Sequence, residues 1–234
     1  MENDSKQKIE VTNGYGWPSI IYEVKMPNYN DIKNEIVNFI QNVKVKKPIH
    51  HSDDAPGGIG PHEQAHKKFL EESYPTLFEN EENKHFNDVK NFCLDATLSI
   101  AIQNNIRYAD TSHWIIAALE SWYHITKDKG FHDIHTHPNS AWCGIFYADI
   151  GDASIKTQNG INRFYSSNSG VLPIVGNEYL SCTSLDAEPE DGKLLIFPGS
   201  VPHSALPYYG KKDRIVISFN SEIVDSRTFK ENIN

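Results

Sequence analysis

Three histidines in the second half of the chain have the spacing of a metal site. His135 and His137 are separated by one residue in the segment 131–149, FHDIHTHPNSAWCGIFYAD, which has the composition of a strand. Side chains alternate between faces along a strand, so we expect these two rings to project to the same side. His203 follows the apolar run LLIF and a Pro-Gly-Ser turn, where a neighbouring strand can deliver a third imidazole. Three ligands on one face leave coordination positions open, as a catalytic metal requires.

A basic residue stands at a fixed distance beyond this trio. Arg214 lies eleven residues after His203 and opens the alternating segment 214–220, RIVISFN. The planar guanidinium of arginine suits a bidentate grip on a carboxylate. The sequence therefore predicts a metal and an organic acid held close together by a β-rich fold.

On these residues, the chain from about residue 120 to 222 resembles the iron(II)- and 2-oxoglutarate-dependent oxygenases of the double-stranded β-helix superfamily. More narrowly, it resembles a bacterial and phage branch with a His-x-His-Pro motif and a Phe-Pro…His…Arg-Ile-x-Ile-x-Phe-Asn ending. The resemblance implies that His135, His137 and His203 are the catalytic ligands of Fe(II) and that Arg214 anchors the co-substrate 2-oxoglutarate. It also implies that O2 is consumed to hydroxylate an unactivated C–H bond of a small molecule or amino-acid-like substrate, with release of succinate and CO2.

The chain departs from the superfamily at one ligand, because His137 occupies the place of the usual aspartate or glutamate. If His137 coordinates, three neutral imidazoles leave the iron more positive by one unit than two histidines and a carboxylate would. If it does not, the open position admits water or halide, as in halogenating relatives. Strand alternation favours coordination by His137.

Several other polar residues are candidates for binding the co-substrate. Ser218 and Asn220 follow Arg214 by four and six residues and share its face of the strand. The full set of candidates beside Arg214 is Tyr147, Ser218, Asn139 and Asn220. Packing or a turn contact explains each of them equally well.

Two other function classes stay open at this point. One is a cupin-like three-histidine metal protein, a dioxygenase or isomerase that does not use 2-oxoglutarate. The other is a non-enzymatic barrel that binds a ligand. Arg214 discriminates between the oxygenase and a simple three-histidine site, because only a diacid gives the guanidinium a task.

The pattern of short β-rich runs and turns predicts a mainly β fold with an α-helical N-terminal elaboration, a double-stranded β-helix of the jelly-roll, cupin-like type. We expect residues 1–110 to form the helical extension packed on the barrel and residues 111–234 to form the catalytic core, in one compact domain. Within the extension we expect an edge strand at residues 19–25, a helix at 28–43 capped by Asn30 or Asp31, and mostly helix at 61–105. The Gly- and Pro-rich segment 49–66 is predicted to be a loop, and a lid over the site is compatible with it.

Composition narrows the partners. The 234 residues include 22 basic and 31 acidic residues, giving a formal charge of −9, so we expect neither nucleic acid nor an anionic membrane as a partner. Three widely spaced cysteines and the lack of a long apolar segment favour a cytoplasmic protein with reduced thiols. The expected partner is a small-molecule substrate, and a homodimer through the N-terminal helices is compatible with the sequence.

Overall fold

The computed structural model describes residues 11–14, 20–44, 69–166 and 184–228. In this part of the chain, antiparallel strands form two sheets. The larger sheet has the order β1-β2-β9-β6-β11-β4-β3 and the smaller one the order β5-β10-β7-β8. The larger sheet consists of β1 (Val11–Gly14), β2 (Ile21–Lys25), β3 (Leu70–Glu72), β4 (Trp114–Thr126), β6 (Trp142–Asp149), β9 (Lys193–Pro198) and β11 (Arg214–Asp225). The smaller sheet consists of β5 (His132–His135), β7 (Asn162–Tyr165), β8 (Ser184–Asp186) and β10 (His203–Ala205).

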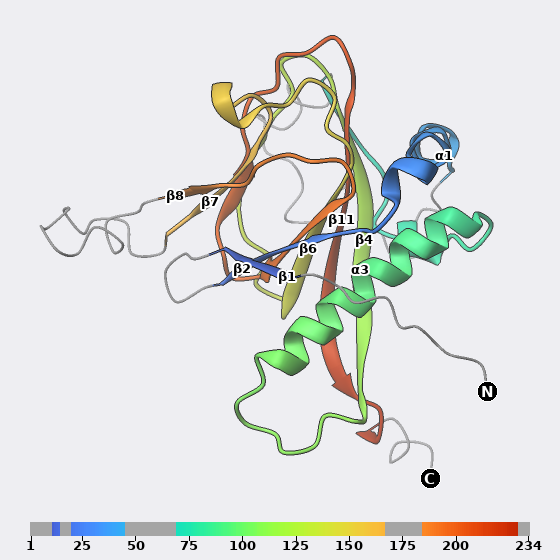
Figure 1. Cartoon of the computed structure of the whole chain (residues 1–234), viewed down its shortest axis with the longest axis vertical. Helices are drawn as coiled ribbons and strands as arrows, with labels where there is room; N and C mark the ends of the chain where they lie inside the picture. Colours follow the sequence, from blue (N-terminus) through green and yellow to red (C-terminus); the bar gives the residue numbers. More distant parts are fainter. Residues whose placement is uncertain (1–10, 15–19, 45–68, 167–183, 229–234) are drawn as a thin grey trace, which may run out of the picture.

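Among the described residues, two α-helices lie on one side of the larger sheet, α1 (Tyr29–Asn42) and α3 (Lys84–Gln103) (Figure 1). The helix expected at 28–43 is confirmed as α1, in which Ile36 and Ile40 are fully buried and Phe39 packs against the same core. The helix begins after Asn28 rather than at Asn30 or Asp31, so the predicted cap was wrong. The cap of α3 is Asn83, whose side chain accepts a hydrogen bond from the backbone N–H of Phe86 at 2.9 Å.

Residue alternation separates two hydrophobic layers. On β9, Leu194 and Ile196 face the helices, whereas Leu195 and Phe197 face the space between the sheets. On β11 the odd-numbered residues from Ile215 to Phe219 join the helix-facing core. The even-numbered residues of β11 therefore point to the opposite face, toward the smaller sheet, and these are Arg214, Val216, Ser218 and Asn220. The larger sheet thus offers one apolar face to the helices and one chemically mixed face to the site.

Several expectations for the N-terminal half need correction. The strand near residue 20 is β2, but β1 pairs along its outer side, so β2 is an inner strand and not an edge. Of the segment 61–105, which was expected to be mostly helical, the helix is confirmed at α3, whereas β3 and the short 3-10 helix η1 (Leu77–Glu79) occupy part of residues 69–83. Residues 61–68 lie outside the described part of the chain. The apolar residues before α3 belong to β3, which pairs with β4, and to a turn that is hydrogen-bonded to β4. Loop 49–66 with its histidines, and Cys182, lie outside the described residues.

Strands β1, β2 and β3 come from the first 110 residues, and β2 and β3 pair with strands of the second half. The boundary at residue 110 stays a prediction. The predicted strands in the second half are confirmed at β6, β7, β9 and β11. With its antiparallel sheets facing each other, the chain has the expected jelly-roll architecture.

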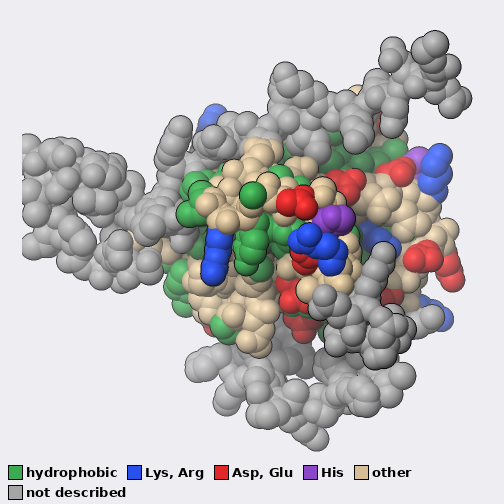
Figure 2. Space-filling model, turned by 90° about the horizontal axis from the view of Figure 1, so that it is seen from below, with side chains coloured by type: hydrophobic (Ala, Val, Ile, Leu, Met, Phe, Trp, Pro, Cys, Tyr) green, Lys and Arg blue, Asp and Glu red, His purple; other side chains and the backbone are tan. Residues whose placement is uncertain are grey.

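Beyond the sandwich, β4 and β11 continue together as a two-stranded ribbon (Figure 1). Their register shifts next to Asn220, where Glu120 pairs with Asn220 but Ala118 pairs with Ser221, so Leu119 is a β-bulge. The ribbon exposes Ile115 and Leu119. The face seen from below carries hydrophobic, acidic and basic side chains side by side (Figure 2). None of the described helices is both long and apolar enough to span a membrane.

Candidate metal and organic-acid site

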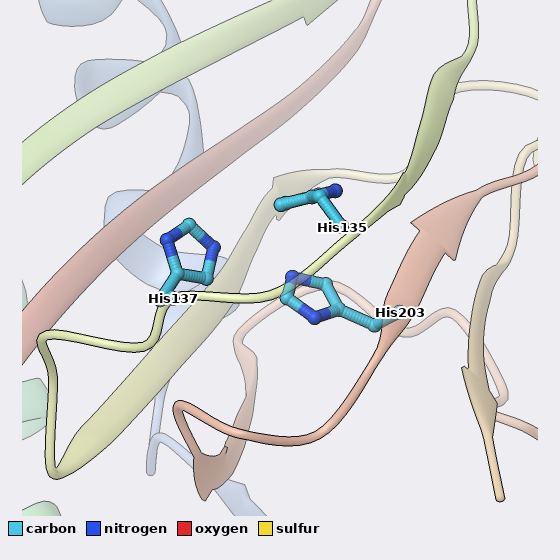
Figure 3. A group of neighbouring side chains, drawn as sticks. All are labelled: His135, His137 and His203. Atoms are coloured by element: carbon cyan, nitrogen blue, oxygen red, sulfur yellow. The ribbon is translucent and has the colours of Figure 1, made fainter. Parts of the chain in front are cut away.

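The three predicted histidines converge in space. One ring nitrogen from each of His135, His137 and His203 lies within 4.8 Å of the others. The ring centroids of His135 and His203 are 4.3 Å apart, and that of His137 lies 5.0 Å and 5.3 Å from them. Figure 3 shows the three imidazoles grouped around one space, with His203 at the start of a short strand and His137 on a loop.

The smaller sheet sets two of these histidines directly. His135 on β5 is the cross-strand partner of His203 on β10. The Nδ1 of His135 donates to the carbonyl of Asp133 at 2.7 Å, and the Nδ1 of His203 donates to the carbonyl of Val201 at 3.0 Å. A carbonyl can only accept, so both rings carry their proton at Nδ1 and keep Nε2 free for a metal. This is the usual way in which a backbone carbonyl orients a metal-binding histidine.

The third histidine reaches the group by a different route from the expected one. Strand β5 ends at His135, so His137 does not follow by strand alternation. Instead its backbone N–H donates to the carbonyl of Gly199, in the turn between β9 and β10, at 2.8 Å. A side chain at Gly199 would collide with the carbonyl oxygens of His137 and Ser140, so only glycine permits this close approach. The turn that leads to His203 therefore also fixes the backbone of His137.

Burial keeps these rings neutral. Desolvation, followed by the neighbouring imidazoles, lowers the pKa of His203 to about 3 and that of His137 to about 4, and burial also lowers the pKa of His135. Neutral imidazole is the form that binds a metal, so the group needs no proton loss at neutral pH.

Arg214 lies in the same pocket as the histidines and is 2% exposed. Its Nη2 donates to Oδ1 of Asn162 at 2.7 Å, and its guanidinium stacks over the ring of Tyr147 at 5.5 Å. The Tyr147 hydroxyl donates to the same Oδ1 at 2.9 Å, and burial raises the pKa of that hydroxyl to about 12. All of these partners are neutral, and the Nε of Arg214 has no hydrogen-bond acceptor among the described residues. A buried guanidinium without an anion is costly, so an acidic ligand at this end of the pocket would stabilise it.

The remaining predicted residues divide into two groups. Ser218 and Asn220 line the pocket, and Tyr147 supports Arg214 from behind. Asn139 is exposed and does not line the pocket. Trp122 lines the pocket with its ring 5.9 Å from that of His137, while Trp142 packs on the helix-facing core beside Tyr22.

Sequence reasoning missed four side chains of the pocket or its rim. Asn162 joins Arg214 to Tyr147, and no sequence motif marks it. His132 lies with its ring 4.2 Å from that of His135, and His124 accepts a hydrogen bond from the indole N–H of Trp122 at 3.0 Å. Trp122 and His124 are two residues apart on one strand and so share a face, and this spacing could have identified His124. Glu120, at the edge of the site, contacts Asn220.

Comparison with known proteins agrees with this geometry. Residues 120–220 match the family described as putative 2OG-Fe(II) oxygenase. No curated protein matches the chain. Among solved structures, a 2OG-Fe(II) oxygenase family oxidoreductase from Burkholderia pseudomallei is 11% identical with a TM-score of 0.50, covering 86% of this chain and 84% of its own.

Two further structures share the fold. HygX from Streptomyces hygroscopicus, solved with nickel and 2-oxoglutarate, is 11% identical with a TM-score of 0.50 and covers 85% of this chain and 82% of its own. A Trichoplax adhaerens prolyl hydroxylase, in complex with a peptide of the hypoxia inducible factor oxygen degradation domain, is 12% identical with a TM-score of 0.52. The match covers 92% of this chain and 87% of the hydroxylase.

At these identities the solved structures show only the fold. The evidence for oxygenase chemistry is the family match. The matched segment contains all three histidines and Arg214. The resemblance predicted from the His-x-His and Arg-Ile motifs is thereby confirmed, since residues 120–220 match the 2OG-Fe(II) oxygenase family.

Proposed function

We propose that His135, His137 and His203 hold iron(II), that Arg214 holds 2-oxoglutarate, and that the chain uses O2 to hydroxylate an unactivated C–H bond of a small-molecule or amino-acid-like substrate. The observation that carries the proposal is the pairing, in one pocket, of three converging imidazoles with a buried and incompletely satisfied guanidinium. When bound, iron(II) and 2-oxoglutarate supply a dioxygen-dependent oxidation that releases succinate and CO2.

The residues present fit both groups. Nitrogen ligands suit iron(II), and three of them leave further positions for an organic acid and dioxygen. The unsatisfied Nε of Arg214 and its Nη groups offer parallel N–H donors to a remote carboxylate. Ser218, four residues along β11, lines the same cavity and provides a hydroxyl donor on the Arg214 face. Asn162 and Tyr147 hold the guanidinium in place, so it is oriented before the acid arrives.

The pocket walls serve the reaction by positioning and by excluding water. Phe197 and Phe164 pack beside His203, with ring centroids 4.6 Å and 6.0 Å from it, so the inner side of the site is dry. A dry wall strengthens the interaction of Arg214 with a carboxylate. Trp122, His124 and His132 also line the pocket, and we place the substrate beside them.

A cupin-like three-histidine protein without 2-oxoglutarate is the second candidate, since the ligand set is three imidazoles. Arg214 argues against it, because a metal site alone leaves the buried charge without a partner. The two candidates therefore differ in whether 2-oxoglutarate binds.

The test is an anaerobic titration of the metal-free protein with iron(II) and then 2-oxoglutarate, followed by visible absorption. We expect the charge-transfer band of the iron–2-oxoglutarate chelate with wild-type protein and with Arg227→Ala, which removes an exposed arginine just beyond the far end of β11. Iron binding without this band at saturating 2-oxoglutarate would exclude the oxygenase and favour the second candidate. Succinate formation, screened against small molecules and amino acids, then identifies the substrate class.

A further inference from the structure

Asn220 sits between two polar side chains of the neighbouring strands. On β11 its cross-strand partners are Glu120 of β4 and Cys143 of β6. Asn220 is 4% exposed. Its Nδ2 donates to Oε2 of Glu120 at 2.8 Å, and its Oδ1 accepts from Sγ of Cys143 at 3.2 Å.

These two contacts fix which way the amide faces. A carboxylate can only accept a hydrogen bond, so the NH2 end of Asn220 must face Glu120. Burial raises the pKa of the Cys143 thiol to about 12, which keeps it protonated and able to donate to the amide oxygen. Turning the amide over would bring two oxygens together at Glu120.

The same Nδ2 lies 3.3 Å from Nδ1 of His137. The amide nitrogen carries hydrogens and offers no lone pair, so Nδ1 of His137 is the acceptor in this arrangement. A neutral imidazole has one N–H, which therefore sits on Nε2, the nitrogen nearer the other two rings (Figure 3). His137 thus differs from His135 and His203, whose protons are held at Nδ1 by backbone carbonyls.

We propose, building on the proposed iron site, that Glu120 acts through Asn220 as a positioning residue that weakens His137 as the third metal ligand. Coordination through Nε2 requires the ring proton to move from Nε2 to Nδ1. The amide of Asn220 must then turn its oxygen toward Nδ1, and it gives up the Glu120 hydrogen bond in doing so. The three proposed ligands include no carboxylate. The carboxylate of Glu120 lies one contact further out, where it opposes coordination by His137 and does not itself bind the metal.

The first test is Glu120→Gln, assayed by cobalt(II) titration of the metal-free protein with the d–d absorption as readout. Glutamine can offer its own NH2 to the turned Asn220 oxygen, so the cost of ligation disappears. We expect cobalt to bind about tenfold more tightly, the lower end of the range for partners of metal ligands. We also expect the spectrum to shift to that of a three-imidazole site.

Glu72→Gln is the matched control. The Glu72 carboxylate lies 3.5 Å from His124, and its charge partly offsets the lowering by burial of the pKa of His135 and His137. Removing a negative charge near a cation site weakens cation binding by simple electrostatics. The two variants are therefore expected to change cobalt affinity in opposite directions, which separates ring positioning from general charge.

The double variant Glu120→Gln with Asn220→Asp keeps the net charge of the wild type and moves the carboxylate next to His137. The glutamine introduced at position 120 can then donate to the new carboxylate at position 220. That carboxylate can in turn accept from Nδ1–H of His137. We expect this protein to bind cobalt most tightly of the series.

The outcomes separate the two proposals. If Glu120→Gln binds cobalt as wild type does, or more weakly in the manner of Glu72→Gln, the positioning role of Glu120 is wrong while the metal site stands. If wild-type protein binds neither cobalt nor iron, both proposals are wrong. Thermal melts of the metal-free variants, expected to match wild type within a few degrees, show that any change in affinity is local.

Discussion

The two sheets contribute to the site in different ways. The larger sheet supplies Arg214 and Asn220 from a twelve-residue strand that is flanked on both sides by neighbours. The smaller sheet supplies His135 and His203 from strands of four and three residues, and this pair rests on one cross-strand position. The Arg214 end of the pocket, where we propose that the acid binds, is thus supported by a long buried ladder, whereas the proposed metal end depends on a few backbone contacts. We expect the metal end to be the more easily disturbed by mutation.

The largest expected effect is at the metal end. His203→Ala removes a proposed ligand that is 3% exposed, and is expected to abolish cobalt and iron binding at micromolar metal, a loss beyond the roughly hundredfold seen for outer partners of ligands. His132→Ala is the control, because this ring neighbours His135 but is not part of the converging group. Equal losses of metal affinity in both variants would mean that metal binds to the histidine-rich pocket without a defined set of three ligands.

Next comes the acid end. Arg214→Ala is expected to weaken 2-oxoglutarate binding by about 2 to 5 kcal/mol, the range for breaking a buried charged contact, and to leave metal affinity unchanged. Arg214→Lys keeps the charge but loses the planar fork, and is expected to fall between wild type and alanine. Calorimetric titration of 2-oxoglutarate into the metal-loaded protein measures both. A loss of metal binding in Arg214→Ala would show that the two ends are not independent.

The contact between the His137 loop and the β9–β10 turn gives a smaller effect. Gly199→Ala places a methyl group against two carbonyl oxygens, so the loop must move. We expect a loss of roughly 1 to 3 kcal/mol in the free energy of unfolding, as for overpacked sites, together with weaker metal binding. Ser200→Ala, at the exposed next position of the turn, is expected to change neither quantity. Urea unfolding with and without cobalt distinguishes the two variants.

The smallest effect concerns pH. The pKa of His203 falls to about 3 in the folded chain, against about 6.5 when exposed, so between these values the unfolded chain binds the extra proton. Stability of the metal-free protein therefore falls as pH drops from 6.5 toward 3, by at most about 1.4 kcal/mol per pH unit for this histidine. Urea midpoints at pH 7 and pH 5 measure the slope. His203→Asn should have a shallower slope, and an unchanged slope would exclude His203 as a source.

The sequence was enough to predict several strands of the second half and the convergence of the three histidines in one pocket with Arg214. Alternation along 214–220 placed Arg214, Ser218 and Asn220 on one face, because successive side chains of a strand point to opposite faces of its sheet. The convergence of His135 and His137 was also expected, although the strand alternation given as its reason was wrong. The hydrogen bond to Gly199 that takes its place joins residues 62 positions apart, and local pattern carries no information on such contacts.

The same limit explains what was missed. Asn162 acquires its role only because β7 of the smaller sheet faces β11 of the larger one. Glu120 pairs with Asn220 because of the strand register next to the bulge at Leu119. The position of a β-bulge cannot be predicted from single residues. In the first half, segment 61–105 was expected to be mostly helical because its apolar residues also fit helical spacing, and pairing with β4 determined the outcome for β3.

The backbone link from His137 to Gly199 has a consequence for how the protein would release its metal. Since the turn that carries this carbonyl also leads into His203, any fluctuation that opens the turn withdraws two of the three imidazoles at once. A metal ion bound here is therefore expected to dissociate in a single cooperative event rather than ligand by ligand. Its rate of transfer to a chelator would then depend on how often the β9–β10 turn opens.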